Sequence, residues 1–188
     1  MLAYALRCFG LLLAFLNCIA CLKEKIVMNI ELLSTAFREG ESIPVQYTCD
    51  GLNVSPPLRW GGIPKNSQSL ALICEDPDAP SGVFVHWVIF NLPPIVSDLP
   101  EATPNTEELV ESGAIQGRND FKKIGYDGPC PPPGKPHRYF FHLYALDTKL
   151  DLQAGATKRE FERAAEDHIL AEGRLMGTYK RGASRAAG

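Results

Sequence analysis

Apolar residues recur in short blocks along this chain, and their spacing predicts strands. Within residues 43–49 every second position is apolar, which is the pattern of a half-buried strand. Three continuous apolar runs, rich in β-branched and aromatic residues, occupy residues 69–74, 83–91 and 139–146. Such runs are typical of interior strands that are covered on both faces. The pattern therefore predicts a mainly β protein.

One segment near the C-terminal end has helical spacing instead. Thr157 and Glu160 have the spacing of a capping box, in which each side chain bonds the backbone amide of the other residue. A stripe at helical spacing then runs to Ile169, and Gly173 is a natural stop. We predict this C-terminal helix and a shorter one over residues 107–112. Proline clusters between the blocks mark stiff loops, and no linker divides the body of the chain.

The N-terminal segment differs from this body. Residues 8–22 (CFGLLLAFLNCIACL) form an apolar run that is shorter than the roughly 20 residues a membrane helix needs, and Arg7 precedes it. A positive residue, an apolar run and small residues are typical of a signal peptide, which we predict over residues 1–21. We expect the folded domain over residues 28–180 and a flexible tail over residues 181–188.

The location of the protein depends on this leader. A cleaved leader makes the protein exported, either periplasmic or secreted. Two alternatives stay open: translation from Met28 would make the protein cytoplasmic, and a lipid-modified Cys21 would anchor it to a membrane.

Composition narrows the class of protein. Hydrophobic residues make up 45% of the 188 residues, which is enough for a packed core. The formal net charge is −3 and no basic stripe is present, so we expect no nucleic-acid partner. Only Cys49, Cys74 and Cys130 lie in the body, which excludes a disulfide-dense scaffold. Cys74 is expected in the core, and a disulfide between Cys49 and Cys130 stays open.

Two proline-rich loops carry the candidate chemistry. The first, DPDAPSG, spans residues 76–82 and precedes His86; the second, GPCPPPGKPHRY, spans residues 128–139. The spacing predicts that Asp76 and Asp78 lean to the same side, and that His86 and Trp87 point to opposite faces of a strand. Each residue also has a structural alternative, because an aspartate can close a turn and a histidine can bond a carbonyl in the core. We assign His142 and His168 to structural roles.

These motifs resemble those of the phosphatidylethanolamine-binding protein family, also called Raf-kinase-inhibitor-like proteins. The segments YTCDGLNVSPPLRWGGIP and NDFKKIGYDGPCPPPG look like its bacterial and archaeal branch, and the similarity runs from about Leu33 to about Lys180. The resemblance implies a β-sandwich-like fold with a C-terminal helix and a small anion-binding pocket. It also implies ligand-binding positions at Asp76, Asp78, His86, Gly128, Pro131, His137 and Tyr139. Better-studied eukaryotic members bind phosphorylated ligands and regulate kinases or proteases; nothing in this chain identifies such a partner.

The chemistry of these residues agrees with anion binding. Imidazole N–H groups, the Tyr139 hydroxyl and loop amides are donors, and Gly128 allows close approach. The carboxylates would repel an anion, so we expect them to orient a histidine, whereas Arg138 pairs with a carboxylate. In the complex, carboxylates and ligand together are expected to raise the histidine pKa above roughly 6.5, so that binding weakens as the pH rises.

We therefore predict a non-catalytic binding module, without a cofactor, for a phosphate-bearing small molecule or lipid head group. Two alternatives stay open. The first is an inhibitor or scaffold that acts on a protein partner. The second is a weak hydrolase in which aspartates and histidines hold a metal or act as acid and base, although no hydrolase or metal motif is present. An exposed strand edge or the C-terminal helix would allow a homodimer.

Overall fold

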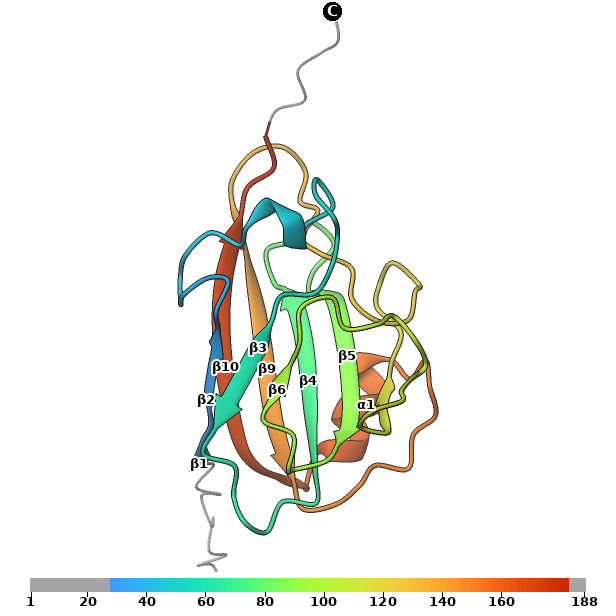
Figure 1. Ribbon diagram of the computed structural model, residues 1–188. Coiled ribbons are helices and arrows are strands. Elements are labelled where there is room, and N and C mark those ends of the chain that lie inside the picture. The colour runs from blue at the N-terminus through green and yellow to red at the C-terminus, as the bar shows by residue number, and fades with distance from the viewer. Residues whose placement is uncertain (1–27, 183–188) are drawn as a thin grey trace, which may run out of the picture.

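The computed structural model describes residues 28–182, which form two sheets and one α-helix (Figure 1). The large sheet has seven strands, in the spatial order β1 (Met28–Asn29), β10 (Ile169–Tyr179), β9 (His137–Leu146), β4 (Ser69–Asp76), β5 (Phe84–Leu92), β8 (Ala114–Gln116) and β7 (Glu108–Leu109). The small sheet has three strands, β2 (Glu31–Ser34), β3 (Leu58–Gly61) and β6 (Asp98–Leu99). All neighbouring strands are antiparallel except β1 and β10.

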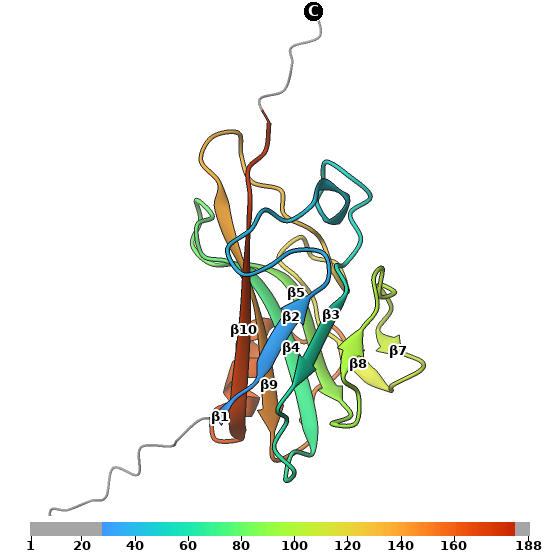
Figure 2. The same ribbon diagram turned by 60° about the vertical axis from the view of Figure 1, so that its left-hand side comes forward.

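The sheets pack face to face, and the small sheet covers one side of the large one (Figures 1 and 2). The core between them includes Leu32, Leu58 and Trp60 of the small sheet and Trp87 and Phe141 of the large sheet. Helix α1 (Lys158–Ala165) lies on the opposite face of the large sheet, where its Phe161 joins a second core. The fold is therefore a β-sandwich with a helix on its outer face, as predicted.

The central strands of the large sheet are buried on both faces. In β4, every residue except Glu75 is buried, because Leu70, Leu72 and Cys74 face the small sheet while Ala71 and Ile73 face α1. Strand β5 has the same character. This explains the continuous apolar runs, and the three strands predicted from them are confirmed as β4, β5 and β9.

The C-terminal helix was predicted correctly at its start and wrongly at its end. Thr157 and Glu160 form the predicted capping box. The helix ends at Ala165, however, and strand β10 begins at Ile169. From Ala171 onward every second residue is buried, which is strand periodicity. Gly173 is therefore a mid-strand residue, and a Cβ atom there would lie 2.4 Å from the carbonyl oxygen of Ile30.

Two further predicted elements are wrong. Residues 43–49 do not form a strand: the amide of Ile43 bonds Thr178, and after Pro44 the chain turns into a short 3₁₀ helix, η1 (Val45–Tyr47). The apolar alternation there comes from separate contacts rather than from a sheet face. Residues 107–112 contain strand β7 followed by a turn, which ends at Gly113 with a φ of 68°.

Some predictions concern residues outside the described range. The predicted signal peptide over residues 1–21 lies outside it, as does all but the first two residues of the tail 181–188. No helix within residues 28–182 combines the length and apolar character that a membrane crossing requires.

The contact at Gly173 makes a testable prediction. Gly173→Ala should lower the free energy of unfolding by roughly 1–3 kcal/mol, because the methyl group meets the Ile30 backbone rather than a flexible side chain. Gly61→Ala is the matched control, since a Cβ atom there has no neighbour within 4 Å. Urea unfolding of both variants tests this. Equal stability of the two variants would show that Ile30 and β10 are not in this close contact.

Candidate functional site

Four polar side chains meet at one end of the large sheet. Asp76 is the last residue of β4, His137 is the first residue of β9, and β9 and β4 are neighbours. Tyr139 lies two residues after His137 and therefore on the same face, and His86 lies near the start of β5. This end is uppermost in Figure 1, where β4 ends and β5 and β9 begin. We call Asp76, His86, His137 and Tyr139 the strand-end cluster.

Asp76 and His137 form a buried pair. The Asp76 carboxylate is 2.8 Å from Nδ1 of His137 through Oδ2, and the amide of Asp78 donates to its other oxygen at 2.8 Å. The two residues are only 3% and 8% exposed. Because an ionised carboxylate only accepts hydrogen bonds, Nδ1 of His137 carries the proton. The expected role of a carboxylate, which is to orient a histidine, is therefore filled by Asp76.

A β-bulge turns His86 toward this pair. Cys74 of β4 lies opposite Trp87, but Glu75 lies opposite Val85, so His86 is the extra residue in β5. Trp87 and Tyr139 both belong to the core between the sheets, and the His86 ring lies beside Phe84 and Tyr139, with centroid distances of 5.3 and 5.2 Å. His86 and Trp87 thus share a face, and the prediction of opposite faces is wrong because it assumed regular pleating.

The loop that follows β8 holds the His86 ring. Nδ1 of His86 lies 2.6 Å from the carbonyl oxygen of Asp127, so Nδ1 carries the proton here too. The Asp127 side chain is buried and accepts hydrogen bonds from Asn53, Asn119 and Lys123. This carboxylate therefore fixes the loop, and through the loop it fixes the tautomer of His86.

Burial decides the charge of His86 in the unliganded protein. His86 is 2% exposed, and this desolvation lowers its pKa below the usual value of about 6.5. The carbonyl of Asp127 and the charge of Asp76 act in the opposite direction without reversing the shift. The ring is therefore neutral near pH 7. The raised histidine pKa expected from the sequence refers to the complex with an anion. Without a ligand, the pKa of His86 is lowered instead.

Tyr139 contributes a buried hydroxyl group that lies close to the Asp76 carboxylate but is poorly aligned with it. The residue is fully buried, and among the described residues its hydroxyl has no hydrogen bond of good geometry. Burial raises the pKa of this phenol well above its usual value, and the charge of Asp76 adds to the effect. A buried hydroxyl without a partner is destabilising, so it requires an explanation.

Asp78 has a different role from Asp76. Its carboxylate accepts from the backbone amide, Nε and Nη2 of Arg138, at 3.0, 2.8 and 2.7 Å. These hydrogen bonds lower the pKa of Asp78 to about 2. The pairing of Arg138 with a carboxylate is confirmed. Asp78 thus fastens the loop after β4 to the start of β9, and its oxygens are occupied.

Gly128 and Pro131 belong to the loop that carries the disulfide. A Cβ atom at Gly128 would lie 2.1 Å from the carbonyl oxygen of Tyr47, so the glycine makes room for the chain itself rather than for a ligand. Its amide donates to Asn53. Cys130 is disulfide-bonded to Cys49, and Pro131 is buried beside it. The pairing left open in the sequence is therefore present in the structure.

The other histidines and Cys74 are placed as expected. His168 lies 2.7 Å from Asp147, and His142 lies 3.5 Å from Glu75 on the outer face of the large sheet. Cys74 is fully buried in the core, where burial raises the pKa of its thiol.

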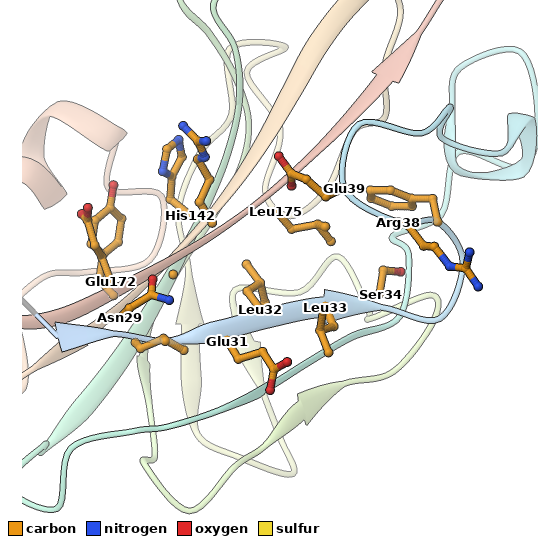
Figure 3. A pocket seen from close by; sticks show the side chains of 15 residues that line it. Asn29, Glu31, Leu32, Leu33, Ser34, Arg38, Glu39, His142, Glu172 and Leu175 are labelled. Carbon is orange, nitrogen blue, oxygen red and sulfur yellow. The ribbon is translucent and has the colours of Figure 1, made fainter.

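Two hollows occur elsewhere on the surface. The larger, about 740 Å³, lies where β2 passes β10, with Leu32 and Leu175 in its wall and Arg38 and Glu172 among its polar residues (Figure 3). The smaller is lined by Arg118, Lys158 and other residues near the start of α1. Neither hollow is lined by a residue that the sequence predicted to bind a ligand. Among residues 28–182, no group of three or more His, Cys, Asp or Glu residues is arranged to hold a metal ion.

Sequence reasoning missed the residues that support the cluster. Asp127, Asn119 and Asn53 form the network behind His86, and they come from two distant segments. Both segments carry the family resemblance, yet the spacing of polar residues within them does not indicate a contact. Only the three-dimensional approach of the two loops brings them together.

Comparison with known proteins places this chain in a family. The family model described as phosphatidylethanolamine-binding protein matches residues 33–180. A UPF0098 protein of Methanothermobacter thermautotrophicus is 54% identical over 155 residues, which are 82% of this chain and 100% of the relative.

Two solved structures share the fold. The first is a phosphatidylethanolamine-binding protein homolog from Chlamydia trachomatis, with a TM-score of 0.75 and 42% identity over 82% of this chain and 99% of that one. The second is YbcL of E. coli, described as a member of the mammalian family, with a TM-score of 0.76 and 31% identity over 81% of this chain and 99% of that one.

Neutral His86 predicts how stability depends on pH. Its pKa is lower in the folded protein than in the unfolded chain, so the unfolded chain binds more protons and stability falls as the pH drops below about 6.5. His86→Asn keeps a donor for the Asp127 carbonyl but does not titrate. Its stability should fall less between pH 7 and pH 5, by at most about 1.4 kcal/mol per pH unit.

Urea unfolding at a series of pH values measures this difference. Gly61→Ala retains every histidine and should keep the pH dependence of the wild type. Parallel curves for wild type and His86→Asn would contradict a neutral, buried His86.

Proposed function

Because this chain belongs to the phosphatidylethanolamine-binding protein family, we propose that it is a non-catalytic binding module for phosphate-bearing small molecules or lipid head groups. The observation that carries the proposal is the Tyr139 hydroxyl, which is buried at the strand-end cluster beside Asp76 and makes no hydrogen bond of good geometry among the described residues. Such a donor is costly in the free protein and becomes favourable when a ligand oxygen accepts its hydrogen bond.

The rest of the cluster supports recognition of a small oxyanion. The two imidazoles are each fixed through Nδ1, and we assign their second ring nitrogens to ligand binding. Their orientation comes from the buried Asp76 carboxylate and from the Asp127 carbonyl, which reduces the entropy lost on binding. Phe84 and Phe121 pack around His86 and limit the access of water.

The Asp76–His137 pair also favours a second candidate function. A carboxylate that bonds Nδ1 of a histidine is the arrangement found in many general bases, so weak hydrolysis of a phosphoester is the alternative. Release of inorganic phosphate from a bound phosphoester, abolished by His137→Asn, would favour this alternative over binding without turnover.

We also propose that the protein is exported. The Cys49–Cys130 disulfide supports this, because such bonds persist mainly in oxidising compartments. Mass spectrometry of the native protein should find a mature N-terminus near Cys21 or Leu22 and no free thiol at Cys49 or Cys130. A native start at Met28 in a cytoplasmic fraction would reject export.

Two tyrosine variants test the binding function. Tyr139→Phe removes a buried hydroxyl that makes no hydrogen bond of good geometry, so it should leave the free energy of unfolding unchanged or raise it. It should weaken phosphate binding by roughly 1.5–3 kcal/mol, or about 10- to 150-fold, the usual range for a hydrogen bond to a charged group. Isothermal titration calorimetry with inorganic phosphate measures the affinity.

Tyr126→Phe is the matched control. The Tyr126 hydroxyl donates to the carbonyl of Tyr47 at 2.8 Å, so its removal should lower stability by roughly 1–2 kcal/mol and leave phosphate affinity unchanged. If the affinity for phosphate were the same in Tyr139→Phe as in the wild type, the strand-end cluster would not be the binding site.

A further inference from the structure

The hydrogen bonds of the two site histidines determine what they can offer a ligand. Nδ1 of His86 donates to a carbonyl oxygen, and Nδ1 of His137 donates to a carboxylate. A carbonyl oxygen and a carboxylate oxygen only accept hydrogen bonds. The proton of each ring therefore stays on Nδ1 when a ligand binds. A neutral ring held in this tautomer presents Nε2 as a hydrogen-bond acceptor. From the sequence both rings were expected to act as donors, whereas a neutral His86 offers Nε2 as an acceptor.

The charged groups around His86 do not change this. The carboxylates of Asp76 on β4 and Asp127 in the loop after β8 attract a proton to His86, and His137 and Tyr139 face the ring from β9. Burial of His86 outweighs the attraction of both carboxylates, so its pKa stays lowered. Two cations close to the cluster are engaged elsewhere, Lys123 with Asp127 and Arg138 with Asp78. A fully ionised oxyanion would therefore face the Nε2 lone pair of His86 and the buried Asp76 carboxylate without the charge of either cation.

From this arrangement we infer that the site selects phosphoryl groups that carry a P–OH proton, and that this proton is donated to Nε2 of His86. The inference rests on the proposed function and specifies its ligand. In the same complex the Tyr139 hydroxyl donates to an unprotonated oxygen of the ligand. His86 and Tyr139 thus supply one acceptor and one donor, and a singly protonated phosphoryl group supplies the complementary pair.

This requirement divides phosphate compounds into two classes. Inorganic phosphate and phosphomonoesters carry a P–OH group near or below neutral pH, since the second pKa of a phosphomonoester is about 6. Phosphodiesters, which include intact phospholipid head groups, and sulfate lack such a proton. The site therefore favours free phosphate and monoesters over diester head groups.

A matched pair of ligands tests the selection. Phosphoethanolamine is a monoester, and glycerophosphoethanolamine is a diester with the same amine. Calorimetry on the wild-type protein at pH 6 should show at least 10-fold tighter binding of the monoester, and at least 10-fold tighter binding of phosphate than of sulfate. Equal affinities within either pair would overturn the inference while leaving anion binding intact. No binding of any of the four ligands would overturn the proposed function itself.

The pH dependence provides a second test on the same protein. Between pH 6 and pH 8 phosphoethanolamine loses its P–OH proton, so its affinity should fall by up to about tenfold per pH unit. Inorganic phosphate keeps one P–OH group over this range and should weaken less. Parallel pH curves for the two ligands would overturn the inference, because they would place the titrating group on the protein.

A variant connects the selection to His86. The amide of Gln in His86→Gln can turn to offer either a donor or an acceptor, so the preference for phosphate over sulfate should drop to less than threefold. His142→Gln, on the outer face of the sheet, is the matched control and should keep the wild-type preference. Near-ultraviolet circular dichroism checks the fold of both variants. A folded His86→Gln protein that still rejects sulfate would overturn the assignment of the acceptor to His86.

Discussion

The buried carboxylate of Asp76 is the constraint on which the site depends. A negative charge at 3% exposure requires compensation, and it receives hydrogen bonds from the amide of Asp78 and from Nδ1 of His137. The first bond shapes the turn after β4, and the second joins that turn to the start of β9. One side chain therefore sets the loop geometry and the histidine tautomer together. Replacing it with an apolar residue would leave both the His137 ring and the turn after β4 without the acceptor that holds them.

A single additional residue in β5 gives the second histidine its place. Strand periodicity would direct His86 and Trp87 to opposite faces, and the core needs Trp87 on the inner face. The β-bulge allows both side chains to face inward, because Cys74 and Glu75 pair with residues that are two positions apart. The carbonyl oxygen of Asp127 then accepts the hydrogen bond from Nδ1 that fixes the displaced His86 ring. The site is thus built where the regular ladder is interrupted, between strands that are otherwise buried on both faces.

The same features decide which parts of the fold and of the site could be predicted from the sequence. The long buried strands, the capping box at Thr157 and the core position of Cys74 follow from local composition, since burial on both faces produces continuous apolar runs. Strand β10 was missed because Ala164, Ala165 and Ile169 have helical spacing, and only the pairing with β9 shows that Gly173 lies within a strand. At the site, residue identities were predictable from the motifs. The bulge at His86 and the support from Asn53 were not, because both depend on contacts between distant segments.

Asp76 and Asp78 show how burial divides roles between similar residues. They are two positions apart and both carboxylates contact the start of β9, one through His137 and the other through Arg138. The Asp78–Arg138 pair is partly exposed, so water screens it and its contribution is mainly to hold the loop in place. The Asp76–His137 pair is buried, so each charge and proton there acts strongly on its neighbours. Sequence spacing alone does not distinguish the two aspartates. Their difference in solvent access does: the partly exposed Asp78 holds the loop in place, and the buried Asp76 orients His137 within the site.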